Sequence, residues 1–267
     1  DPDRTSLNGT GGKMEFGKFG GNWNFMLFSV LRSPGFEIND LGYMRTADDM
    51  VHGIWSAYNI NEPNSFYRRI RFNFNSHSSW DFGFNLRRIG GNLSMYTQFK
   101  NFWSLNIGGS INSNGISTTI MRGGPNMRVP GGNGLFWSLS TDNRKKVIVR
   151  ANGSHYWARK DFSSSSSMSL NTSYRPVNNL SISLSPSYSR NISDLQYVNV
   201  FSNEEGEASY VFADLAQNVL SMSLRINYNI TPDLSIQYWG QPFLAAADYS
   251  SFKIITEPMA DEYTERY

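Results

Sequence analysis

Cysteine is absent from this sequence of 267 residues. Its absence excludes disulfide frameworks, thiolate zinc sites and cysteine nucleophiles. Long apolar runs are also missing, because no stretch approaches the 18 or so consecutive apolar residues that a membrane-spanning helix needs. Charged residues make up only 17% of the chain, and 24 basic and 22 acidic side chains leave a net charge of +2 without a basic run. Nucleic acid is therefore not an expected partner.

Common enzyme motifs are missing as well. The sequence has no phosphate-binding glycine loop, HExxH, GxSxG or calcium-loop motif. Its three histidines, His52, His77 and His155, are far apart in the sequence, and loop or membrane-interface positions explain them better than a metal site. We therefore predict no enzyme activity, no metal and no cofactor. No shift in composition marks a boundary, so residues 1–267 are interpreted as one unit.

Aromatic residues are abundant, at 15% of the chain, and apolar and polar residues alternate with a period of 2. The pattern repeats in segments of about ten residues, the length of a tilted strand that crosses a bilayer. It is clearest in segments 80–86, 103–108, 180–189 and 220–230. Successive side chains of a strand point to opposite faces, so each segment has one apolar and one polar face.

Alternation also fits a soluble β-sandwich, but three features favour a membrane barrel. The apolar rows end in aromatic residues, namely Trp80, Trp103, Tyr174, Tyr188 and Tyr228. The polar rows consist of Ser, Asn and Gly instead of Lys and Glu. Short turns at 174–180 and 228–234 contrast with long connections at 33–49, 121–134 and 191–207 and in the tail after residue 240. The glycine- and proline-rich segment 121–134 is expected to fold inward, and the serine run 163–167 to end a long strand.

The predicted fold is all-β, an antiparallel transmembrane outer-membrane β-barrel with about 14 to 16 strands in this chain. Candidate strands are 12–19, 22–32, 50–60, 66–76, 79–89, 92–99, 101–112, 116–122, 132–141, 144–154, 165–175, 178–190, 193–202, 207–215, 217–230 and 233–243. The chain starts at Asp1 without a signal peptide, and residues 262–267 do not resemble a closing strand. Two interpretations fit these ends: a protein whose signal peptide has been removed, or the C-terminal part of a longer chain with a truncated barrel. We favour the second.

Basic residues provide the first candidate site. Arg69, Arg71, Arg87 and Arg88 lie on or beside the polar rows of neighbouring strands, where they would form a basic stripe inside a barrel and favour anionic solutes. The alternative, which we prefer, is a structural role in which these arginines pair with Asp or Glu.

An acidic loop provides the second candidate site, formed by Glu37, Asp40, Asp48 and Asp49. Paired carboxylates there could serve glycoside hydrolysis or bind a cation. A hydrated loop with Asx turns is the commoner explanation of such a cluster.

Three segments carry a resemblance to a known family: residues 32–49 (RSPGFEINDLGYMRTADD), 121–125 (MRGGP) and 238–252 (from YWGQPF to YSSF). The chain resembles, over most of its length, the C-terminal β-barrel region of Bacteroidota-type outer-membrane proteins that carry an N-terminal family-9-like carbohydrate-binding module. The resemblance implies that this module and the first barrel strands precede the segment. It implies no catalytic residue, because the barrel region of that family is uncharacterised.

The leading functional hypothesis is a non-enzymatic barrel in the outer membrane of a Gram-negative envelope. It would anchor or support a surface glycan-binding or envelope-assembly system, with membrane lipid as its partner and glycans or other envelope proteins as further candidates. The first alternative is a porin-like channel or transporter for anionic or oligosaccharide solutes. The second is a glycan hydrolase that uses the acidic loop.

Overall fold

The structure is a computed structural model, and it describes residues 6, 8–44, 46–159, 162–202, 204 and 206–267. These residues form an all-β fold in which every strand pairing is antiparallel. The strands are β1 (Gly11–Lys18), β2 (Trp23–Arg32), β3 (Asp49–Ile60), β4 (Tyr67–Trp80), β5 (Leu86–Phe99), β6 (Ser104–Asn112), β7 (Gly115–Ser117), β8 (Met127–Val129), β9 (Gly132–Ser140), β10 (Val147–Ala158), β11 (Ser163–Val177), β12 (Leu180–Ser202), β13 (Ala208–Thr231), β14 (Leu234–Gly240) and β15 (Phe243–Ile255). A short 3-10 helix, η2 (Tyr263–Glu265), lies near the C-terminus.

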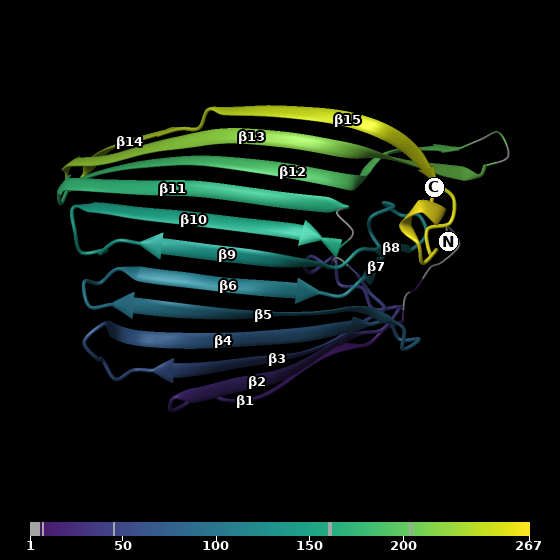
Figure 1. The fold of residues 1–267 in the computed structure, drawn as a ribbon, viewed down its shortest axis with the longest axis horizontal. Coiled ribbons are helices and arrows are strands. Elements are labelled where there is room, and N and C mark those ends of the chain that lie inside the picture. Colours follow the sequence, from purple (N-terminus) through teal and green to yellow (C-terminus); the bar gives the residue numbers. More distant parts are fainter. Residues whose placement is uncertain (1–5, 7, 45, 160–161, 203, 205) are drawn as a thin grey trace.

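Thirteen strands form one curved up-and-down sheet in the order β1-β2-β3-β4-β5-β6-β9-β10-β11-β12-β13-β14, and β15 continues β14 along β13 (Figure 1). Short turns connect the strands at one end, on the left of Figure 1, which we call the turn end. The long connections, the β7–β8 hairpin and the C-terminal residues lie at the other end, which we call the loop end.

The sheet is open. In the part of the chain that the structure describes, β1 pairs only with β2, and β14 and β15 pair only with β13. The expected all-β antiparallel fold is therefore confirmed, whereas the expected closed barrel is not found in this chain. Among the residues that the structure describes, both edges of the sheet lack a neighbouring strand, and β1 is exposed along its whole length.

Strand boundaries differ from the prediction where polar turns interrupt an alternating pattern. The predicted strand 79–89 is wrong, because β4 ends at Trp80 and β5 begins at Leu86. The Asp81 carboxylate accepts a hydrogen bond of 2.8 Å from the backbone N–H of Asn85, and Phe84 has a left-handed φ of 60°. Such a side-chain-to-backbone contact closes a turn that residue polarity alone does not reveal.

Two predicted long connections contain strands. The candidate strand 193–202 is confirmed as the end of β12, which extends through segment 191–207 as far as Ser202, and the tail after residue 240 contains β15, because β13 supplies a partner edge for both. Segment 121–134 includes β8 and the first residues of β9, and the predicted strand 116–122 shrinks to β7. The loop over residues 33–44 and 46–48, the strand at 163–167 and the tight turns at Asn178–Asn179 and Pro232–Asp233 are confirmed.

The register gives the sheet two chemically different faces, as the alternation predicts. We call one the apolar face; its side chains include Leu27, Leu31, Ile54, Phe72, Phe74, Leu93, Ile107, Ile111, Leu135, Leu170, Leu184, Leu220 and Leu224. We call the other the polar face; its side chains include Asn73, Asn75, Asn92, Ser94, Asn106, Ser138, Asn152, Ser169, Ser183, Ser187, Ser221 and Ser223. Polar-face side chains bond one another across strands, as Asn75 does to Asn92 (3.0 Å) and Ser187 to Ser221 (2.7 Å).

Glycine is required at two strand positions of the polar face. Phe28 is the register partner of Gly53, and Phe136 is the partner of Gly108. In each pair the phenyl ring lies over the glycine, so that a Cβ atom there would collide with the ring. An aromatic ring thus fills the space that the glycine leaves empty.

The compact hydrophobic core lies at the loop end and not under the middle of the sheet. Met121, Met127, Phe212 and Ile255 are its buried members. Residues 256–267, which we call the C-terminal cap, lie beside this core. Arg266 in the cap donates hydrogen bonds to the backbone oxygens of Arg128 (3.0 Å), Ala260 (2.9 Å) and Asp261 (3.1 Å).

Candidate functional site

A pocket of about 700 Å³ opens on the polar face near the loop end. Strands β2, β3, β4 and β5 contribute most of its polar side chains, and β7 and the residues after it form another wall. The charged residues at this pocket are Arg32, Asp49, Arg87 and Arg88, and its polar residues include His77 and Ser79. We call it the polar pocket.

Asp49 is the buried anchor of the polar pocket, with 6% of its surface exposed. Its carboxylate accepts a hydrogen bond from the Ser79 hydroxyl (2.9 Å) and lies 3.1 Å from the Arg32 guanidinium. Asp49 starts β3 and Arg32 ends β2, so their direct register pairing places the two charges together. An ion pair with a hydrogen bond to the second oxygen satisfies the buried carboxylate.

Asp48 and Arg87 form a second ion pair beside it. The Asp48 carboxylate lies 3.1 Å from the Arg87 guanidinium and accepts a hydrogen bond of 2.9 Å from the backbone N–H of Phe82. Asp48 has a left-handed φ of 53°, a conformation that Asp tolerates better than most residues. These contacts hold the loop before β3 against the turn between β4 and β5.

Arg88 is the remaining cation of the polar pocket. Within the described residues, no ion pair to Arg88 is present, whereas Arg32 and Arg87 are both paired. Gly115 of β7 lies so close that an added Cβ atom would come within 3.3 Å of the Arg88 Nε atom. Three arginines against two aspartates leave one net positive charge, which would favour a small anion or a polar solute over a cation.

The structure brings together only part of the predicted sites. Asp48 pairs with Arg87 and Asp49 pairs with Arg32 in or beside the polar pocket, while Glu37 and Asp40 are exposed and do not line it. The two aspartates are bound to arginines and not to each other, an arrangement that offers no free pair of carboxylates for hydrolysis.

Arg69 and Arg71 lie near the turn end. Arg69 stacks over Tyr96 and Arg71 over Trp55, at 5.3 and 5.6 Å from the ring centroids. Arg88 is the register partner of Ser79. Ser79 lies ten residues along β4 from Arg69, a separation of about 33 Å. The four arginines therefore do not form one continuous stripe.

The histidines are separated in space as well. His77 lines the polar pocket, whereas His52 and His155 lie on the apolar face, and the His155 ring is hydrogen-bonded to Ser166 (2.7 Å). In the described ranges, no three side chains of His, Asp or Glu come close enough together to hold a metal ion.

Sequence reasoning missed a cluster that ties the C-terminal cap to the sheet. Lys253 donates hydrogen bonds to the Asp214 carboxylate (2.8 Å) and the Tyr263 hydroxyl (2.9 Å), and Tyr263 donates to the backbone oxygen of Asp194 (2.9 Å). Burial raises the pKa of Tyr263, although the hydrogen bond from Lys253 acts in the opposite direction. Asp194, Asp214 and the pair Lys253 and Tyr263 are far apart in the chain, so no local sequence motif predicts these hydrogen bonds.

The fold and the pocket define the class as an all-β protein built on one open antiparallel sheet with an apolar and a polar face. A family model matches residues 2–261, and the chain belongs to this family, DUF5916, a domain of unknown function. Neither the curated proteins nor the solved structures include a significant match. No helix in the described residues has the length and apolar character to span a membrane. The carbohydrate-binding module and the bacterial group implied by the resemblance stay predictions.

Proposed function

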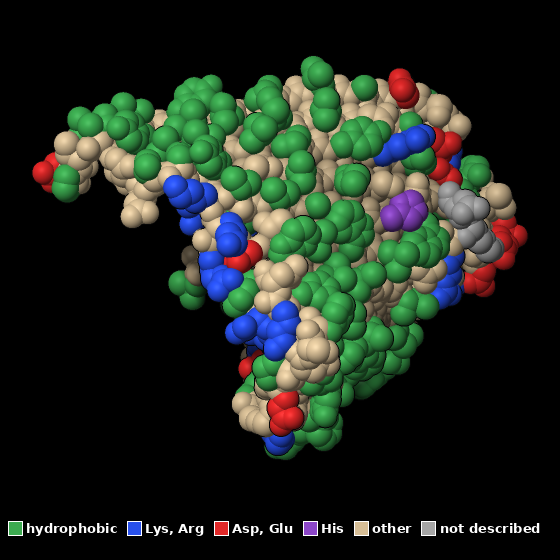
Figure 2. Space-filling model, turned by 60° about the vertical axis from the view of Figure 1, so that its left-hand side comes forward, with side chains coloured by type: hydrophobic (Ala, Val, Ile, Leu, Met, Phe, Trp, Pro, Cys, Tyr) green, Lys and Arg blue, Asp and Glu red, His purple; other side chains and the backbone are tan. Residues whose placement is uncertain are grey.

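We propose that this protein is embedded in the outer membrane by the apolar face of its sheet and acts as an anchor or scaffold for a surface glycan-binding or envelope-assembly system. The observation that supports this proposal is the exposure of large apolar side chains in the middle of the sheet. Leu93, Leu135 and Leu220 are 59%, 58% and 52% exposed. Figure 2 displays such hydrophobic side chains over much of the visible surface.

An apolar surface of this extent is unusual for a protein in water. Soluble monomers rarely expose contiguous apolar patches larger than a few hundred Å², whereas the apolar face extends over the length and width of a 13-stranded sheet. Hydrocarbon would remove the unfavourable hydration of these side chains, at about 25 cal/mol for each Å² covered. The polar face would then enclose water and the loop-end segments.

The turn end has the composition of a membrane interface. Four exposed aromatic residues lie there on the apolar face, namely Trp23, Tyr58, Tyr174 and Tyr228, and a fifth, Trp103, directly precedes strand β6. Eight cations lie within three residues of the short turns, Lys18, Arg68, Arg69, Lys100, Arg144, Lys145, Lys146 and Arg175, against three acids, Glu62, Asp142 and Asp233. Figure 2, in which this end is turned forward, has Lys and Arg side chains gathered beside hydrophobic ones. Such a belt suits contact with lipid headgroups.

The two open edges add a requirement to the proposal. An unpaired backbone N–H or C=O group costs several kcal/mol in hydrocarbon. The membrane form therefore includes further strands that pair with β1 at one edge and with β14 and β15 at the other, so that the edges are satisfied. A complete barrel of this kind would place the polar pocket inside it.

The scaffold is favoured over the channel because structured segments occupy the loop end. The β7–β8 hairpin packs against β5, and the C-terminal cap is held by Lys253 and Arg266. A channel for anionic or oligosaccharide solutes is the second candidate, supported by the net positive charge of the polar pocket. The link to glycans rests on the resemblance described above.

Fractionation of cells that produce the protein tests the membrane location. We expect the protein in the outer-membrane fraction, resistant to a high-salt wash and released by detergent. Recovery in a soluble fraction without detergent would contradict the proposal. Planar-bilayer recording then separates the two candidates: a scaffold is electrically silent, whereas a channel gives steps of conductance that change when Arg88 is replaced by Gln.

A further inference from the structure

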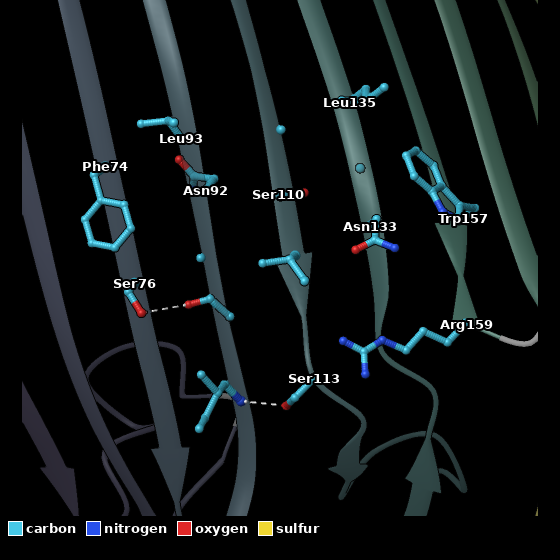
Figure 3. Close-up of a pocket in the computed structure, with 16 residues that line it drawn as sticks. Phe74, Ser76, Asn92, Leu93, Ser110, Ser113, Asn133, Leu135, Trp157 and Arg159 are labelled. Atoms are coloured by element: carbon cyan, nitrogen blue, oxygen red, sulfur yellow. Dashed lines mark hydrogen bonds between the residues drawn. The ribbon is translucent and has the colours of Figure 1, made fainter.

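A furrow of about 720 Å³ lies on the apolar face and crosses strands β4 to β10 toward the loop end (Figure 3). Large apolar side chains form its walls, including Phe74, Leu93, Ile111, Leu135 and Trp157. The volume is in the range of 300–1,000 Å³ that is typical of sites for small molecules.

Two glycines account for the hollow. Gly91 is the register partner of Ile111, and Gly109 is the partner of both Leu93 and Leu135. Neither glycine has a side chain, whereas their register partners have large ones. The furrow is therefore deepest at the two glycines. At Gly109 an added Cβ atom would meet its nearest neighbours at 3.4 Å, an ordinary contact, and a larger side chain would therefore extend into the furrow.

Polar groups converge at the loop end of the furrow. In Figure 3 the Arg159 side chain extends from the end of β10 toward the space below Asn133. Among the described residues, neither side chain has a hydrogen-bond or ion-pair partner, although the backbone N–H of Arg159 donates to Gly131 (2.8 Å). The Arg159 guanidinium and the Asn133 amide thus lie beside the apolar furrow, and their N–H groups are available to donate hydrogen bonds.

We propose that the furrow is a binding site for one acyl chain of an anionic phospholipid, with the lipid phosphate at Arg159 and Asn133. The inference rests on the proposed membrane location and names a partner for it. The apolar walls of the furrow continue to Arg159 at the loop end, so a chain that lies in the furrow can place its phosphate at the guanidinium. The planar guanidinium matches a phosphate through two parallel hydrogen bonds, and the apolar walls match the chain.

Native mass spectrometry of the detergent-purified protein tests this site. The probes are phosphatidylglycerol and phosphatidylcholine with identical acyl chains. We expect one phosphatidylglycerol to be retained in preference to phosphatidylcholine. Arg159→Gln should weaken phosphatidylglycerol binding about tenfold and remove the preference, because a charge-assisted hydrogen bond is lost. Lys13→Gln, which removes an exposed cation of β1 outside both the furrow and the turn-end belt, should have no effect.

Filling the furrow gives an independent variant. Gly109→Leu should abolish the retention of both lipids, whereas Thr172→Leu, on the apolar face outside the furrow, should not. If Gly109→Leu does not fold, the lipid preference of Arg159→Gln decides the question.

Two failures are distinguishable. If the protein needs detergent but retains no lipid, or if folded Gly109→Leu and Arg159→Gln bind phosphatidylglycerol as the parent protein does, the site is wrong while the membrane location stands. If the protein is stable and monodisperse without detergent, the proposed function itself is wrong.

Discussion

Leu184 of β12 and Leu224 of β13 are direct register partners on the apolar face. One residue away, Ser185 and Ser223 form the next pair on the opposite face. Two neighbouring positions of β13 thus meet different surroundings, and a pair of substitutions can compare them within one strand.

Leu224→Arg should lower the free energy of unfolding by about 2–4 kcal/mol if the position lies near the middle of a bilayer. The control is Ser223→Arg, which places the same charge on the polar face and should cost much less. Urea titration of the protein refolded in lipid vesicles measures both. Equal effects of the two substitutions would show that the faces are wrongly assigned.

The buried ion pair of the polar pocket should contribute to stability. Asp49→Asn removes the charge that Arg32 faces, so we expect a loss of about 1–3 kcal/mol in the same titration. Asp40→Asn is the matched control, because Asp40 is exposed and outside the pocket. A neutral Asp49→Asn variant would contradict a structural role for the pair.

Removal of one hydroxyl should loosen the C-terminal cap. Tyr263→Phe deletes the donor to Asp194 and the acceptor for Lys253, at a cost of about 1–2 kcal/mol. Hydrogen exchange followed by mass spectrometry should detect faster exchange in residues 256–267, with the central strands unchanged. If the exchange of the cap is unaltered, the hydroxyl does not hold it.

The turn between β9 and β10 should respond to acid. Hydrogen bonds from the Arg144 side chain lower the pKa of Asp142 from its usual 3.8 to about 2. Because the folded pKa is depressed, the stabilisation is complete above about pH 4 and is lost as the pH falls toward 2. Carboxyl NMR shifts followed against pH should give this pKa, and Arg144→Gln should raise it toward 3.8. A pKa of Asp142 that Arg144→Gln leaves unchanged would contradict the assignment.

The sequence made the two faces of the sheet predictable, because side-chain direction in a strand follows from residue parity alone. The turn after Trp80 was not predictable, since Phe82 and Phe84 continue the apolar alternation although Asp81 and Asn85 close a turn. Closure of the sheet was not predictable either. Alternation specifies a strand and its faces but says nothing about whether the first and last strands meet.

The polar pocket was predictable only in part. Asp48 and Asp49 were noted for their charge, as was Arg87, yet their pairing depends on the register between β2 and β3 and on the turn before β5. Arg32 was missed because its partner is 17 residues away in the chain. The furrow arises from Gly91 and Gly109, which in the sequence look like ordinary interruptions of two apolar rows.

The pairs Phe28–Gly53 and Phe136–Gly108 fix the alignment of a repetitive sheet. Serine and asparagine recur along the polar face, so a strand displaced by two residues would keep its faces and lose little side-chain complementarity. A displacement of that size at β2 and β3 would bring the Phe28 ring against Val51 or Trp55 in place of Gly53. The two glycine–phenylalanine pairs therefore select one register of the neighbouring strands over registers displaced by two residues.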